Sequence, residues 1–158
     1  MNALLLRYLP AHDPSRLVYL HTTGQPSGGS QTGRGDTSLT MEIFQQMRKE
    51  KGVFADVTAY VPLAIGSVAV RYRKDPREAN AEMVSGNFFS LLGIMPALGR
   101  TVQVEDEVSH AQVAFLSYAW WTRQFGRDAS VIGQSVYIKG RAVYDRWSGI
   151  ARVYRRGP

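Results

Sequence analysis

Short strand patterns and short helix patterns follow one another irregularly along this chain of 158 residues. A doubly wound fold requires a regular alternation of buried strands and longer helices, and no such rhythm is present. The sequence therefore predicts an α+β fold of mixed short strands and a few short packing helices. Strands are predicted over residues 16–22, 56–61, 65–72, 79–85, 112–116 and 135–139, and helices over residues 38–51, 87–92, 117–125 and 128–132.

The clearest helix pattern covers residues 38–51. Leu39, Ile43 and Met47 recur every four residues and, with Phe44 beside them, form one apolar stripe. Ser38 is predicted to cap the start of this helix, because its hydroxyl oxygen can accept a hydrogen bond from a free backbone N–H. We expect the stripe to pack on the sheet of the same chain.

The clearest strand pattern lies within residues 65–72. Val68, Val70 and Tyr72 occupy every second position, which is typical of a strand with one buried face. The polar run 74–77 is predicted to form the turn that follows. The strand at 135–139 is predicted to be the last of the chain.

The helix predicted over residues 117–125 is rich in aromatic residues, and Ser117 is its expected N-cap. The aromatic residues are Tyr118, Trp120, Trp121 and Phe125. Such residues could stack nucleic-acid bases, with Arg123 and Arg127 beside them. Packing is the favoured interpretation, because a short helix in a small domain is anchored by large aromatic side chains.

The sequence contains no recognisable catalytic constellation. His12, His21 and His110 are scattered, and the acidic run 105–107 is expected to be solvated. Ser117 follows a strand, but it lacks the flanking glycines of a nucleophile elbow. The chain has no cysteine, which excludes thiolate metal sites. We therefore predict that the protein is not an enzyme, that it has no catalytic, cofactor-binding or metal-binding residues, and that it uses no cofactor.

The positive charge of the chain is concentrated at its C-terminal end. The net charge is +6, and residues 140–158 carry five arginines against Asp145 alone, so they supply +4 of it. A basic balance suggests nucleic acid or an acidic membrane surface as partners. Without the tail the chain is nearly neutral. The sequence has no run of about 18 apolar residues, so it predicts no membrane span. The first ten residues are not expected to form a signal peptide.

Three blocks of the sequence, in order, resemble one family. Residues 84–100 read V-S-G-N-F-F-S-L-L-G-I-M-P-A-L-G-R, which is similar to the signature V-S-x-N-F-F-x-x-L-G-x-x-P-x-x-G-R. Residues 113–126 resemble V-x-V-L-S-x-x-x-W-x-x-x-F-G, and residues 128–140 resemble the block after it. These are signatures of the MacB-like periplasmic core domain, which occurs in ABC transporter permeases of the MacB and LolE class. The residues of these blocks are most similar to those of acidobacterial permeases.

The resemblance implies a function and a location. The chain would be an extracytoplasmic, non-catalytic domain fragment of a permease, transmitting conformational change in export or efflux. Its partners would be a cytoplasmic ATPase subunit, a second permease copy and periplasmic proteins, without nucleic acid or a small-molecule cofactor. The domain would lie in the periplasm, on a protein of the inner membrane. The alternative is a basic nucleic-acid-binding module that uses the helix at 117–125 and the arginine-rich tail.

The resemblance ends near Gly140, where the family continues with a pattern similar to x-P-Y-T-V-V-G-V-A. We therefore expect a MacB-like domain over residues 1–140, incomplete at its C-terminus, and an aberrant basic tail over residues 141–158. A shift of one base in the reading frame would account for the tail. Because tryptophan has a single codon, the shifted frame must encode glycine at position 147. The family pattern has a glycine at this position. The expected consequence is an incomplete sheet and low solubility.

Overall fold

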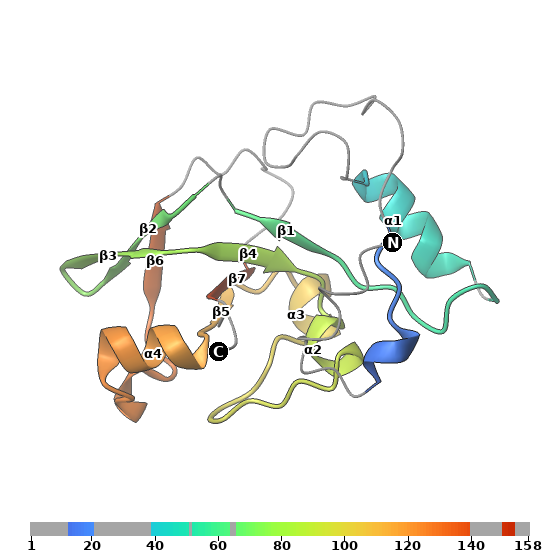
Figure 1. Cartoon of the computed structure of the whole chain (residues 1–158). Coiled ribbons are helices and arrows are strands. Elements are labelled where there is room, and N and C mark those ends of the chain that lie inside the picture. Colours follow the sequence, from blue (N-terminus) through green and yellow to red (C-terminus); the bar gives the residue numbers. More distant parts are fainter. Residues whose placement is uncertain (1–12, 21–38, 51, 64–65, 140–149, 154–158) are drawn as a thin grey trace.

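The computed structural model describes residues 13–20, 39–50, 52–63, 66–139 and 150–153 (Figure 1). The helices are the 3-10 helices η2 (Pro14–Arg16) and η3 (Ala129–Val131) and the α-helices α1 (Met41–Lys49), α2 (Phe88–Leu91), α3 (Val104–Val108) and α4 (Tyr118–Phe125). The strands are β1 (Tyr60–Pro62), β2 (Val68–Tyr72), β3 (Asp75–Ala79), β4 (Ala81–Val84), β5 (Val113–Phe115), β6 (Val136–Lys139) and β7 (Ile150–Val153). The predicted α+β class is confirmed.

The strands form two small sheets. One sheet has the order β1-β4-β7-β5 and the other has the order β3-β2-β6. In the first, β7 pairs antiparallel with β4 and parallel with β5. The expectation that the strand at 135–139 is the last is therefore wrong, because β7 inserts between two strands that lie far earlier in the sequence.

The three-stranded sheet is built on β2, whose alternation confirms the sequence pattern. Val68, Val70 and Tyr72 are buried and the residues between them are exposed. The predicted turn at 74–77 is wrong, because β3 already begins at Asp75, opposite Tyr72. Arg73 adopts a left-handed backbone with φ of 55°, which closes the hairpin early. Pro76 is tolerated in β3 because this is an edge strand of the sheet.

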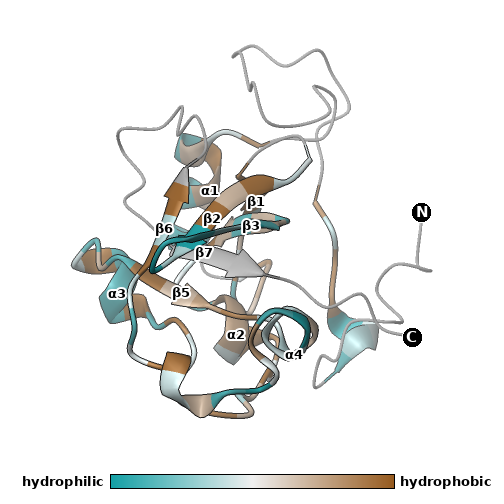
Figure 2. Cartoon of the chain, turned by 90° about the vertical axis from the view of Figure 1, so that its left-hand side faces the viewer, coloured by the Kyte–Doolittle hydropathy of each residue, from teal (hydrophilic) through white to brown (hydrophobic). Residues whose placement is uncertain are grey.

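Helix α4 packs on this sheet and closes a first core. Its buried members are Val68, Val70, Ala79, Ala81 and Trp120. Ser117 caps the helix by accepting a hydrogen bond from the Trp120 backbone N–H, as predicted. Gly126 ends it in a left-handed conformation with φ of 56°. In Figure 2, β3 has the colour of hydrophilic residues, in keeping with its place at the edge of the three-stranded sheet.

A second core lies under the four-stranded sheet, around α2. Its buried members are Val84, Phe88, Phe89, Leu92 and Val102. Phe89 is fully buried, and its ring centroid lies 4.6 Å from that of Phe115 in β5. Helix α2 confirms the short helix predicted over 87–92, and β5 confirms the strand predicted over 112–116.

The N-terminal part differs most from the sequence-based prediction. Residues 17–20 form no regular strand, and Leu17 packs against the second core as irregular chain. Helix α1 begins at Met41, where Thr40 acts as the N-cap, whereas Ser38 lies outside the described residues. Within the predicted stripe, Phe44 is buried, whereas Ile43 is 37% exposed.

Strand β1 begins at residue 60 and not at the predicted residue 56. Side chains hold the chain before it: the Val57 N–H donates to the Asp56 carboxylate over 2.8 Å, and the Ala59 N–H donates to the Ser85 hydroxyl over 3.0 Å. These bonds satisfy the backbone locally, so ladder pairing with β4 starts only at Tyr60.

Candidate functional site

A buried hydroxyl and a buried amide join the loop before β1 to the start of α2. Ser85 is fully buried, and its hydroxyl lies 2.8 Å from Asn87 Oδ1 and 2.7 Å from Thr58 Oγ1. Asn87 Nδ2 donates to Asp56 Oδ2 and to the Val57 carbonyl, both over 3.0 Å. The polar atoms of Ser85 and Asn87 are thus used to fix the backbone, which is how buried polar groups are normally accommodated.

One carboxylate connects three helices. Glu107 of α3 accepts a hydrogen bond from Arg48 Nη1 of α1 over 2.8 Å, and another from the Gly86 backbone N–H over 2.7 Å. Gly86 directly precedes the turn into α2, so α1, α2 and α3 meet at this side chain. We call Arg48, Gly86 and Glu107 the Glu107 junction.

The junction requires a close approach of two backbones. A Cβ at Gly86 would lie 2.6 Å from the Gln103 carbonyl oxygen and 2.6 Å from Val104 Cα. Both neighbours are backbone atoms at the start of α3, so no side-chain rotation could relieve the contact. Glycine is therefore needed here for space.

A second ion pair fixes the other end of the loop between α2 and α3. Arg100 donates to both carboxylate oxygens of Asp106, over 2.6 Å and 2.8 Å, and Asp106 also accepts from the Gln103 N–H over 2.9 Å. The side-chain hydrogen bond from Arg100 is the main reason that the pKa of Asp106 is lowered, and it raises the pKa of Arg100 in turn. The folded structure therefore favours the charged form of Asp106.

The acidic run 105–107 is consequently not the solvated loop that the sequence suggested. The residues belong to α3, Asp106 is buried, and both Asp106 and Glu107 bind arginines. Sequence reasoning missed this because the two arginines come from other elements. The sequence shows that these arginines and carboxylates exist, but it does not show that they pair with one another.

A cavity of about 300 Å³ lies beside this region, at the end of α1. Its lining consists of Met47, Arg48, Glu50, Gly52, Phe54, Ala55, Asp56 and Val57. Arg48 and Asp56 are already bonded to Glu107 and Asn87. These two charged side chains of the lining are therefore already engaged within the protein.

The histidines do not assemble into a site among the residues that the structure describes. His110 is exposed in the turn after α3, whereas His12 and His21 lie outside the described part of the chain. Within that part, no group of three or more histidine, aspartate or glutamate side chains could hold a metal ion.

The aromatic residues of α4 serve packing for the most part. Trp120 is 2% exposed, and its indole N–H donates to the Glu78 carbonyl over 3.0 Å. Trp121 is half-buried and donates to the Asp128 carbonyl over 2.8 Å. The Phe125 ring lies between Tyr72 and Trp120, at centroid distances of 5.1 and 5.3 Å. These rings offer no continuous platform for bases, so nothing here supports the nucleic-acid alternative.

Comparison with known proteins agrees with the sequence blocks and the fold. The model of the MacB-like periplasmic core domain family matches residues 5–151, which is most of the chain. A comparison with curated proteins finds no match. Among the described residues, no helix has the length and apolar character needed to cross a membrane. This chain therefore belongs to the family of MacB-like periplasmic core domains, which are periplasmic domains of ABC transporter permeases.

Proposed function

We propose that this chain is a non-catalytic extracytoplasmic domain fragment that transmits conformational change within an export or efflux permease. The observation that carries the proposal is the Glu107 junction. A domain that passes on motion needs stiff connections between its elements, and here one carboxylate binds a side chain of α1 and the backbone before α2.

The position of α1 makes it a suitable input element. Phe44 is the one buried residue within this helix, and Arg48 supplies its ion pair to the body through Glu107. Helix α2, at the other side of the junction, is anchored in the second core by Phe88 and Phe89. A displacement of α1 would therefore be passed to α2 through the junction.

The proposal includes the partners and the location that the family suggests. These are a cytoplasmic ATPase subunit, a second copy of the permease and periplasmic proteins, with the domain held at the inner membrane. No catalytic role is proposed, because the charged groups of α1 and α3 described above are bonded to one another.

Distance measurements between spin labels in the intact permease, assembled with its ATPase, would test transmission. Labels at the exposed Ser90 of α2, one in each copy, are compared without nucleotide and with ATP. We expect ATP to change the distance distribution, and Glu107→Ala to reduce that change. Glu105→Ala is the matched control, because Glu105 is the exposed neighbour on the same helix. An unchanged distribution on ATP binding in the unmodified permease would refute the proposal.

We also propose that the domain boundary lies near Gly140 and that residues 141–158 are read in a shifted frame. The excess of arginine and the codon of Trp147 support this. The family match to residue 151 and the pairing of β7 count against it. The nucleotide sequence of the gene decides. If the shifted frame does not continue into further domain and membrane helices, the proposal fails, and a neighbouring ATPase gene would support the transporter assignment.

A further inference from the structure

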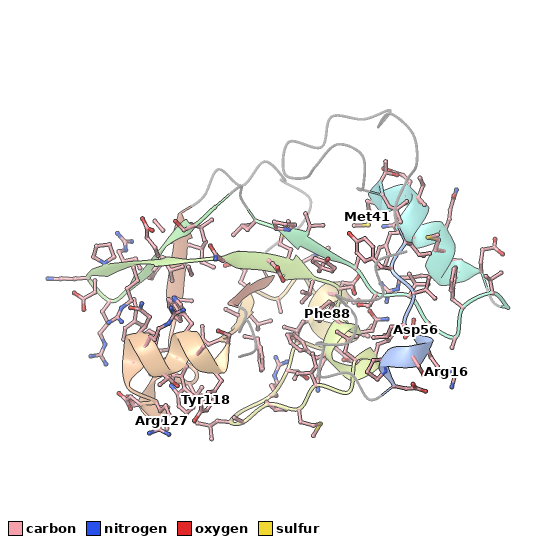
Figure 3. All side chains as sticks on the ribbon, viewed as in Figure 1. Arg16, Met41, Asp56, Phe88, Tyr118 and Arg127 are labelled. Carbon is pink, nitrogen blue, oxygen red and sulfur yellow. The ribbon has the colours of Figure 1, made fainter. Side chains whose placement is uncertain are left out.

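Positively charged side chains lie on both faces of the sheet near the turn of the β2–β3 hairpin and at the end of α4. We call this surface the basic tip, and it consists of Arg71, Arg73, Lys74, Arg123 and Arg127. All five are exposed. Figure 3 shows Arg127 at the end of α4 and further nitrogen-tipped side chains around the hairpin.

The hairpin and α4 are held together as one body. The rings of Tyr72 and Phe125 meet edge to face at 5.1 Å, and the half-buried Arg77 donates to the Gln124 side-chain oxygen over 3.1 Å and to the Gln124 carbonyl. Hydrogen bonds from the Ser130 backbone and hydroxyl, with a smaller contribution from the charge of Arg73, lower the pKa of Asp128. Tyr72 and Arg77, on either side of the hairpin turn, thus join the hairpin to the end of α4.

Tyrosine rings support the guanidinium groups of the basic tip. Arg71 lies over the ring of Tyr137 at 5.1 Å, and Arg73 lies over the ring of Tyr72 at 5.1 Å. Arg127 donates to the Tyr118 hydroxyl over 3.4 Å. Stacking on a ring holds a guanidinium group in place while its N–H edges stay available for oxygen acceptors.

The tip carries more positive charge than the rest of the folded body. Together with Arg77 it has six positive charges, against the carboxylates of Asp75, Glu78 and Asp128, which leaves +3. Residues 1–139 together carry +2, because the remaining +4 of the chain lies in residues 140–158. The rest of the body is therefore slightly negative, and the tip forms a local positive pole.

We propose that the basic tip binds the phosphate groups of anionic phospholipids at the periplasmic surface of the membrane. The combination of arginine with exposed tyrosine favours a lipid surface over an acidic protein segment, because the arginine fork matches the geometry of a phosphate group and tyrosine is enriched at both membrane–water interfaces. Tyr137 is 57% exposed and Tyr118 is 44% exposed. The proposal rests on the membrane location proposed above, and it adds a second contact between the domain and the bilayer.

Sedimentation of the 158-residue chain with liposomes tests this proposal. The probes are liposomes of phosphatidylcholine alone and of phosphatidylcholine mixed with phosphatidylglycerol. We expect binding to the anionic liposomes only, and weaker binding as salt is raised. The tip variant carries Arg73→Gln and Lys74→Gln. The matched control carries Arg16→Gln and Lys49→Gln, which remove the same charge from exposed positions elsewhere.

The tip variant is expected to bind anionic liposomes about 30-fold more weakly, since each of its two removed basic residues contributes on the order of 1 kcal/mol near a membrane surface. The control is expected to stay within about threefold of the unmodified chain. Equal losses in the two variants would mean that net charge alone, or the tail, governs binding, and the proposal would be wrong. Arg127→Gln, expected to weaken binding about fivefold, tests the same surface should the tip variant fail to fold.

A polyglutamate peptide separates the lipid surface from an acidic protein partner. If the tip variant loses affinity for polyglutamate but binds anionic liposomes as the unmodified chain does, the partner is an acidic protein segment and the lipid proposal is refuted. Because the liposome assay uses no nucleotide, it can fail while the ATP-dependent movement of α2 is observed, and the reverse also holds.

Discussion

Trp120→Ala would measure how much of the stability of the domain depends on α4. The side chain is 2% exposed, it lies in the first core with Val68 and Val70, and its indole N–H bonds the Glu78 carbonyl. The substitution removes all of these contacts at once. It also removes the most buried ring of the proposed nucleic-acid platform, so stability and nucleic-acid binding can be compared in one variant.

The size of the loss follows from the buried area. A buried aromatic side chain removes roughly 150–250 Å² from water, which at about 25 cal/mol per Å² corresponds to about 4–6 kcal/mol. Measured losses for tryptophan to alanine in protein cores are about 3–5 kcal/mol. The lost hydrogen bond adds about 1 kcal/mol. We therefore expect a loss of about 4–6 kcal/mol, which is a large part of the stability of an ordinary domain.

Pulse proteolysis in urea measures the folded fraction at low protein concentration, where aggregation is limited. Trp121→Ala is the matched control, because Trp121 is its half-buried neighbour on the same helix. We expect this control to lose about 1–3 kcal/mol, in proportion to its smaller burial. If Trp120→Ala loses no more stability than Trp121→Ala, α4 does not anchor the first core and the packing interpretation is refuted.

Three further predictions concern the second core and the α4 surface. Gly86→Ala is expected to lose about 2–4 kcal/mol of stability in the same assay, because the new methyl group would press on backbone atoms of α3. Its control, Gly126→Ala, places the methyl group in open space and should lose only about 1–2 kcal/mol, because of the left-handed backbone. A larger loss for Gly126→Ala than for Gly86→Ala would contradict the close approach of the two backbones at Gly86. Because folding lowers the pKa of Asp106, the unfolded chain binds the proton first, so this carboxylate stabilises the fold above about pH 4 and the contribution fades as the pH falls further. Unfolding of Asp106→Asn between pH 6 and pH 3 should show a flatter acid limb, and an unchanged limb would remove Asp106 as its cause. In a mobility-shift assay across salt concentrations, Trp121→Ala should leave any residual DNA or RNA binding unchanged, and a specific loss would revive the nucleic-acid alternative.

The elements that the sequence predicted well are those whose signals are local. The boundaries of α4 follow from Ser117 and Gly126, which satisfy or release the helix ends within a few residues. The alternation of Val68, Val70 and Tyr72 specifies the buried face of β2 without reference to any partner. The blocks around residues 84–126 identified the family for the same reason, since their caps, turns and buried rings are adjacent in the chain.

The misplaced elements depend on partners that lie far away in the sequence. The chain before β1 is held by Ser85 and Asn87, and so it does not extend as the strand predicted at 56–61. The insertion of β7 between β4 and β5 satisfies backbone groups of strands that are more than 30 residues away, and no local pattern encodes that pairing.

The sequence by itself determined the fold class, the family and the absence of a recognisable catalytic motif, because these rest on local patterns and residue types. The tertiary structure alone decided what the charged residues do. Glu107 meets Arg48 across 59 positions, and Arg77 meets Gln124 of α4 across 47 positions through the packing of the hairpin. A charge acts through its neighbours in space, and the order of residues along the chain does not specify them.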